Sequence, residues 1–182
     1  SLAGVEGFSR WTAKGYFVSV QMTPRWNMIS NPTSGNLPVS TLYPAAVPGS
    51  TYEYDGSYHS SILLVPGRGY WTKFPNATTN ATIPGMPLQD TSVTLIPGWN
   101  MIGSVDHEVA APAIGGIVTG ATFGYAGGYQ VATVLKPGKG YWIKSSGGEL
   151  TLGPLAAPKH AAEDYSAYSR ITISDKNGSA QT

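Results

Sequence analysis

The sequence predicts an all-β fold in which two pseudo-equivalent antiparallel β units form a sandwich- or barrel-like body. Three observations support this prediction: the chain repeats itself after 71 to 73 residues, turn-forming residues are abundant, and no segment shows a sustained helical period. A fixed internal period indicates a duplicated structural unit. The 23 Gly and 14 Pro residues indicate many turns between short strands.

Two motifs carry the repeat. Trp-Asn-Met-Ile occurs at residues 26–29 and again at 99–102, 73 positions later. Pro-Gly-Arg/Lys-Gly-Tyr-Trp occurs at residues 66–71 and again at 137–142, 71 positions later. Since a single repeat of roughly 70 residues would bury a thin core by itself, we expect the two copies to pack together as one domain.

The first copy begins with short strands separated by turn signals. Residues 17–22 alternate apolar and polar side chains, which predicts a half-buried strand that ends at Pro24. Residues 26–29 form a second short strand. Residues 37–48 are interrupted by proline, so we expect at most one helical turn there.

The rest of the first copy predicts a hairpin followed by a strand, a turn and a strand. Tyrosine-bearing strands flank Asp55-Gly56, a dipeptide typical of hairpin turns. Residues 63–73 read as a strand, a Pro-Gly turn and a strand. The second copy repeats both patterns, at residues 123–129 and 134–144, and we expect residues 75–91 to connect the copies.

These signals divide the chain into five segments. We predict a leading strand or lid (residues 1–16), a first β repeat (17–84), a second β repeat packed with it (85–154), a linker (155–169) and the start of a following β module (170–182).

Composition and charge restrict the kinds of partner and the cellular location that we expect. The net charge is +1 with 12% charged residues and no basic cluster, so we expect no nucleic-acid partner. Cysteine is absent, which excludes disulfides and thiolate metal sites. No apolar run approaches membrane-spanning length, so we expect no membrane insertion. The glycine, proline and tyrosine content predicts an extracellular or cell-surface protein.

Together, the two motifs resemble a recurrent β repeat of secreted bacterial and archaeal proteins, in which a "GWNLI" element is followed by "PGKGYWVK". The resemblance covers residues 17–154 and implies an accessory region of multimodular surface proteins, secreted hydrolases or adhesin-like chains. It implies no catalytic constellation. The first copy departs from the family pattern at Arg25, where the family has Gly. Residues 171–181 also resemble module starts near the C-terminal sorting regions of such proteins.

Two tryptophans are the main candidate binding residues. Side chains alternate along a strand, so Trp71 shares a face with Lys73, and Trp142 shares a face with Lys144. The opposite face of the second strand is the more apolar one, so we expect both tryptophans to lie nearer solvent. Exposed rings of this kind stack on the apolar faces of sugars. The alternative is that both rings are packing residues, covered by the lysine stems or by another strand.

Other aromatic residues allow two interpretations. Trp26 and Trp99 alternate with methionines, which predicts core positions. Tyrosines around the hairpins, including Tyr54 and Tyr125, either line a binding groove or form cross-strand pairs on a sheet. The sequence leaves that choice open.

The sequence gives little support for catalysis or for metal binding. Asp106-His107-Glu108 are consecutive and cannot converge on one ion from a strand, so we expect a surface loop. Glu53 and Asp55 share a face and are possible carboxylates for glycoside hydrolysis, but they flank a turn and have no counterparts in the second copy. We therefore expect no catalytic residues, no metal and no cofactor.

The sequence thus predicts a non-catalytic accessory module of a secreted multimodular protein that binds polysaccharide through aromatic residues. The ligand-binding candidates are Trp71, Trp142, Lys73, Lys144, Tyr54 and Tyr125. The alternative is a structural or adhesive spacer in a cell-surface or appendage assembly, whose partners are neighbouring surface-protein modules rather than a glycan.

Overall fold

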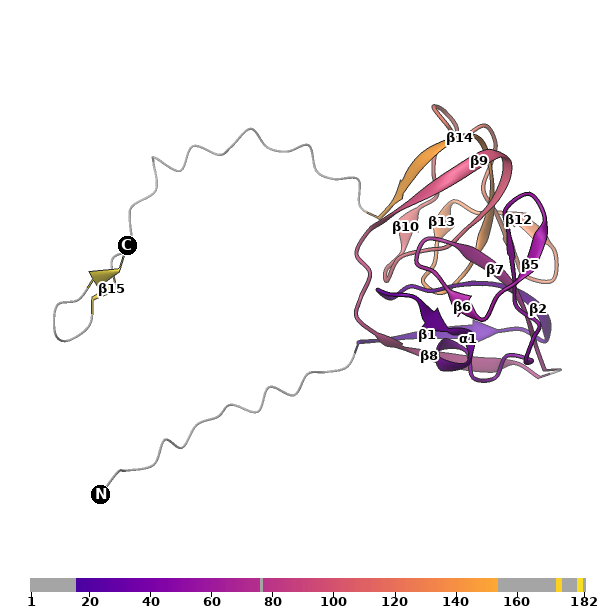
Figure 1. Ribbon diagram of the computed structural model, residues 1–182, viewed down its shortest axis with the longest axis horizontal. Helices are drawn as coiled ribbons and strands as arrows, with labels where there is room; N and C mark the ends of the chain where they lie inside the picture. The colour runs from indigo at the N-terminus through magenta and orange to yellow at the C-terminus, as the bar shows by residue number, and fades with distance from the viewer. Residues whose placement is uncertain (1–15, 76, 154–172, 175–179, 182) are drawn as a thin grey trace, which may run out of the picture.

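Paired β-strands make up most of the computed structural model, which describes residues 16–75, 77–153, 173–174 and 180–181 (Figure 1). The sheets are antiparallel, and the one helix among the described residues, α1 (Val39–Leu42), is a single turn. The all-β prediction is therefore confirmed as a sandwich-like body. The strand pairings in the described part of the chain close no barrel.

The first repeat is built on a hairpin that breaks in the middle of both arms. Its outer part pairs β1 (Tyr16–Met22) with β8 (Thr79–Gly85), and its inner part pairs β2 (Arg25–Ser30) with β7 (Gly69–Phe74). The inner part continues into a four-stranded sheet of order β2-β7-β4-β5, with β4 (Tyr52–Tyr54) and β5 (Tyr58–Ser60). Two short strands, β3 (Leu37–Pro38) and β6 (Leu63–Leu64), pair separately.

The second repeat has the same plan with unbroken arms. β9 (Thr91–Ile102) pairs with β14 (Tyr141–Leu152), and the sheet continues through β11 (Phe123–Tyr125) to β12 (Tyr129–Val131). Its order, β12-β11-β14-β9, matches β5-β4-β7-β2 of the first repeat. The β9–β14 ribbon lies at the top of Figure 1 and the β1–β8 ribbon at the bottom. The remaining pairs are β10 (Val109–Ala110) with β13 (Val134–Leu135), and β15 (Ile173–Ser174) with β16 (Ala180–Gln181).

Several sequence predictions on these elements are confirmed, and one is wrong. The strand before Pro24, the tyrosine hairpins and the single helical turn are all present. Residues 75–91, however, are more than a connection, because they contain the whole of β8. In that strand only Ala81 and Ile83 are buried, so the face that points into the core consists of two side chains, one of them small. Residues 1–15 of the predicted leading segment, the whole predicted linker (155–169) and most of the predicted following module (170–182) lie outside the described residues.

An asparagine stabilises the same turn in both repeats. The Asn27 side chain accepts a hydrogen bond from the backbone N–H of Thr23 (3.0 Å) and donates to the Thr23 and Arg25 carbonyls. Asn100 makes the matching bonds with the backbone of residues 96 and 98. The turn requires a positive φ, which is +101° at Gly98 and +71° at Arg25. Arg25 thus keeps the turn geometry, although a side chain disfavours that region.

Each repeat has its own hydrophobic core. The first core surrounds Ile29, Tyr70 and Phe74, and the second surrounds Ile102, Tyr141 and Ile143. Tyr70 and Tyr141 lie on the face of each strand opposite the tryptophan, and both are buried, as the more apolar character of that face in the second strand predicts. Their hydroxyls accept equivalent hydrogen bonds from loop backbone N–H groups, Val65 to Tyr70 (2.9 Å) and Lys136 to Tyr141 (2.7 Å).

Reciprocal contacts join the two repeats. The N–H of Ser30 donates to the Gly138 carbonyl (3.0 Å), and the N–H of Gly103 donates to the Gly67 carbonyl (2.8 Å). In each case the residue that follows one Trp-Asn-Met-Ile motif meets the Pro-Gly turn of the other repeat. A twofold axis produces this pattern: one part of the first unit contacts another part of the second, and the same two parts meet again with the units exchanged. The repeats therefore interlock about a pseudo-twofold axis.

Candidate functional site

A third apolar cluster lies between the repeats and is mostly aromatic. Its buried members are Met28, Met101 and Trp142. Strand register explains its composition, because residues directly opposite each other in an antiparallel pair share a face. Met28 lies opposite Trp71, and Met101 lies opposite Trp142. The partly buried members of the cluster are Tyr54, Trp71, Phe123 and Tyr125.

The cluster is held together by aromatic pairs that cross from one repeat to the other. Tyr54 packs edge-on against Trp142, with ring centroids 5.0 Å apart at 78°. Tyr125 packs edge-on against Trp71, with ring centroids 4.9 Å apart at 77°. T-shaped pairs at such distances contribute about 0.5–1.5 kcal/mol each beyond area burial. The hairpin tyrosine of each repeat thus covers the tryptophan of the other.

Two open hollows flank this cluster, and every residue lining them is aromatic. The Trp99 hollow, about 520 Å³, is lined by Tyr54, Tyr58, Trp99, Phe123, Tyr129 and Trp142. The Trp26 hollow, about 500 Å³, is lined by Trp26, Tyr52, Tyr58, Trp71, Tyr125 and Tyr129.

Tyr58 and Tyr129 form a wall shared by both hollows. Their side chains are 54% and 59% exposed, and each packs against the other tyrosine of its own hairpin. Partial burial and the neighbouring Tyr129 hydroxyl raise the pKa of Tyr58, while a hydrogen bond with Trp71 lowers it. With its pKa raised overall, the Tyr58 hydroxyl is protonated at neutral pH and can donate a hydrogen bond.

The structure places the predicted site residues in different positions. Trp71 and Trp142 both line a hollow, but Trp142 is only 9% exposed and belongs to the buried cluster. The expectation that it lies nearer solvent is therefore wrong, because Tyr54 from the other repeat covers it. Lys73 and Lys144 are exposed and line neither hollow. They lie opposite Trp26 and Trp99, respectively, in the strand pairs.

The core positions predicted for Trp26 and Trp99 are also wrong. These rings are 39% and 42% exposed and form one side of each hollow. They do share a face with the buried methionines, as the alternation indicates, but they lie at the end of the face that the other repeat leaves uncovered. Sequence reasoning missed Phe123 as a lining residue. Its equivalence to Tyr52 in the repeat was the signal that could have found it.

The acidic residues considered for catalysis are engaged elsewhere. Glu53 pairs with Arg68 at 3.3 Å, and Asp55 pairs with His59 at 3.0 Å. Neither carboxylate lines either aromatic hollow. Glu53 is thus paired with an arginine of the Pro-Gly turn, and Asp55 with a histidine of its own hairpin.

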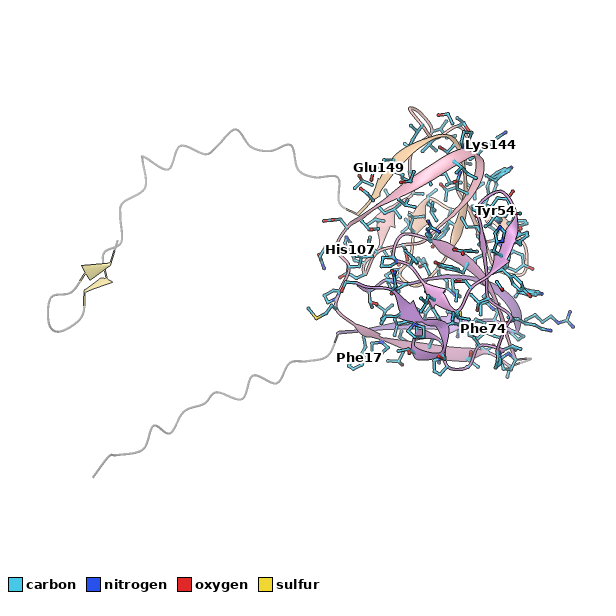
Figure 2. All side chains as sticks on the ribbon, in the orientation of Figure 1. Phe17, Tyr54, Phe74, His107, Lys144 and Glu149 are labelled. Atoms are coloured by element: carbon cyan, nitrogen blue, oxygen red, sulfur yellow. The ribbon has the colours of Figure 1, made fainter. Side chains whose placement is uncertain are left out.

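The acidic loop of the second repeat lies away from the hollows. Asp106 contacts the His107 ring and accepts a hydrogen bond from Gln89 (2.7 Å). In Figure 2, His107 and Glu149 lie at the left of the folded body, whereas Tyr54 lies at the right. Within residues 16–75 and 77–153, no group of three or more His, Asp or Glu side chains could hold a metal ion.

Comparison of the chain with family models, with curated proteins and with solved structures gives no match. The resemblance to a secreted β repeat therefore stays a prediction.

No helix in the described part of the chain is long and apolar enough to cross a membrane.

Proposed function

We propose that this chain is a non-catalytic accessory module of a secreted, multimodular protein, and that it binds a neutral polysaccharide in its two aromatic hollows. One observation carries the proposal: both hollows are open to solvent and lined by aromatic rings alone. Soluble proteins rarely leave large apolar patches exposed unless the patch binds something. A set of aromatic residues gathered from both repeats is such a patch.

Sugar rings suit this lining. The apolar face of a pyranose stacks on tryptophan and tyrosine rings through dispersion and burial. Five of the ten lining residues are tyrosines, whose hydroxyls can donate and accept hydrogen bonds with sugar hydroxyls. No charged side chain lines either hollow, which favours a neutral ligand over an acidic one. The hollows are shallow and offer few polar groups, so we expect affinity per hollow in the range of about 10 μM to 1 mM.

Binding to insoluble polysaccharides tests the proposal. Wild-type protein is mixed with cellulose, chitin, xylan and starch granules, and the bound fraction is measured after sedimentation. Wild-type protein should be retained on at least one of them, and the double variant Trp26→Ala/Trp99→Ala should lose that retention.

The control is Phe17→Ala, which removes an aromatic ring that is 60% exposed on β1 and lines neither hollow. This variant should bind like the wild type. Retention of the double variant at the wild-type level would show that the hollows are not the site. If no polysaccharide retains the wild type, glycan binding is refuted and the structural or adhesive spacer becomes the better interpretation.

A further inference from the structure

The two hollows are equivalent, residue by residue. Replacing each residue that lines the Trp99 hollow by its counterpart in the other repeat gives the lining of the Trp26 hollow, with no residue left over. Trp99 becomes Trp26, Trp142 becomes Trp71, and Tyr58 and Tyr129 exchange. The intra-repeat geometry agrees: Trp26 and Trp71 are 6.4 Å apart at 89°, and Trp99 and Trp142 are 6.3 Å apart at 83°.

The relation between the hollows is a rotation and not a translation along the surface. The reciprocal pairs Tyr54–Trp142 and Tyr125–Trp71 are those of a twofold axis. Tyr58 and Tyr129, which line both hollows, lie on either side of that axis. Because both hollows open to solvent beside this shared wall, the axis runs through the wall and out of the surface.

Rotation about a twofold axis normal to the surface reverses the direction of any chain that lies along that surface. A polysaccharide has a reducing and a non-reducing end, so a chain that enters one hollow in its preferred direction would cross the second hollow backwards. One continuous chain therefore cannot make equivalent contacts in both hollows. Two chain segments that run in opposite directions can.

We propose that the two hollows are independent half-sites that hold two antiparallel glycan segments, so that a single module joins two polysaccharide chains. This inference rests on the proposed glycan binding. Joining two chains would make the module a cross-linker, which one continuous site along a single chain would not be. The shared wall of Tyr58 and Tyr129 would separate the two bound segments.

The half-sites differ at one lining position. Tyr52 in the Trp26 hollow corresponds to Phe123 in the Trp99 hollow, so the Trp26 hollow has one more hydroxyl. A hydroxyl that bonds to a sugar contributes about 2- to 10-fold in affinity. We therefore expect the Trp26 hollow to bind more tightly, and Tyr52→Phe to bring the two affinities together.

Isothermal titration of the full chain with short and long oligosaccharides tests the inference. The probes are cellotriose, chitotriose, xylotriose and maltotriose, each with its hexasaccharide. A trisaccharide that binds should show two sites per chain, and its hexasaccharide should also bind two per chain, with an affinity within about threefold per site. Trp26→Ala and Trp99→Ala should each leave one site, and the double variant should leave none.

Each outcome has a distinct meaning. One hexasaccharide per chain, bound at least about 100-fold more tightly than the trisaccharide, would show a single bridging ligand and overturn the inference while glycan binding stands. Absence of heat with every probe would overturn the proposed function and the inference with it. If an alanine variant unfolds, Trp26→Phe and Trp99→Phe replace it, because each keeps an aromatic ring in its hollow. Each should weaken one of the two sites and leave the other unchanged, and weakening of both sites by either variant would overturn the inference.

Discussion

Substitution of Gly140 by alanine tests whether the two repeats need their close backbone approach. A Cβ at this position would lie 2.7 Å from the Ile29 carbonyl oxygen, whereas close C–H···O contacts have C···O distances of about 3.3–3.6 Å. The obstructing atom is backbone, so the two repeats must separate by about 0.6–0.9 Å to relieve the contact. The same movement strains the hydrogen bond from the Gly140 N–H to the Met28 carbonyl (3.0 Å).

The expected loss of folding stability combines three contributions to the free energy. Overpacking costs about 1–3 kcal/mol, and a weakened hydrogen bond adds up to about 1 kcal/mol. The lower entropy of the unfolded alanine chain offsets about 0.4–1 kcal/mol. We therefore expect Gly140→Ala to lower the free energy of unfolding by about 1–3 kcal/mol, or roughly 4 °C in Tm per kcal/mol.

Urea denaturation and calorimetry of three alanine variants measure the effect. The matched control is Gly128→Ala, because a Cβ at Gly128 meets no heavy atom within 4 Å. Gly69→Ala should behave like Gly140→Ala, since its Cβ would lie 2.5 Å from the Ile102 carbonyl oxygen. If Gly140→Ala is as stable as Gly128→Ala within about 0.5 kcal/mol, the close approach is not required and the argument fails.

Three further predictions follow from features of the structure. Arg25→Gly should raise the free energy of unfolding by about 0.5–1 kcal/mol, because Arg25 holds a φ of +71° that disfavours a side chain. Gly98→Ala should lower it, because Gly98 has a φ of +101°. Chemical denaturation that finds both variants as stable as the wild type would contradict this prediction. Trp142→Ala should cost about 3–5 kcal/mol of stability and Trp99→Ala far less, a difference that thermal melts would reveal. Burial raises the pKa of Tyr43, Tyr70 and Tyr141 in the folded protein. Their contribution to the free energy of unfolding should therefore be fully present below about pH 10, the pKa of tyrosine in the unfolded chain, and should be lost as the pH rises above it. Urea titrations at pH 8 and pH 11 would detect the difference.

Local signals in the sequence were sufficient for most strands and turns. The Pro-Gly turns require a positive φ at glycine, and Gly67 (+80°) and Gly138 (+73°) have it. The hairpins at Asp55-Gly56 and its counterpart follow from turn chemistry in the same way. These features depend on a few neighbouring residues, so a single sequence is enough to predict them.

The strand β8 depends on a distant partner and was missed for that reason. It pairs along its whole length with β1, which precedes it by about 60 residues. Its own pattern is weak, because Pro84 interrupts it and its buried side chains include a small alanine. Nothing within the segment indicates the partner that makes it a strand.

The candidate site was predictable in its residue types but not in its exposure. Alternation placed Trp71 and Trp142 together on the face opposite Tyr70 and Tyr141, and that face forms the third cluster and not the solvent-facing surface that the sequence predicted. It could not show that the hairpin of one repeat covers Trp142, nor that Trp26 and Trp99 lie beyond that cover. Alternation states which residues share a face. Only the packing of the two repeats decides which parts of that face remain exposed.

The reciprocal contacts between the repeats have the form of a homodimer interface, although both halves belong to one chain. Two separate copies of a single repeat that made the same Pro-Gly and Tyr-Trp contacts would first have to meet in solution. The covalent connection through residues 86–90 replaces that encounter with a high effective concentration. A single chain also allows the two halves to differ, as they do where Tyr52 of the first repeat corresponds to Phe123 of the second, a difference that two identical subunits cannot have.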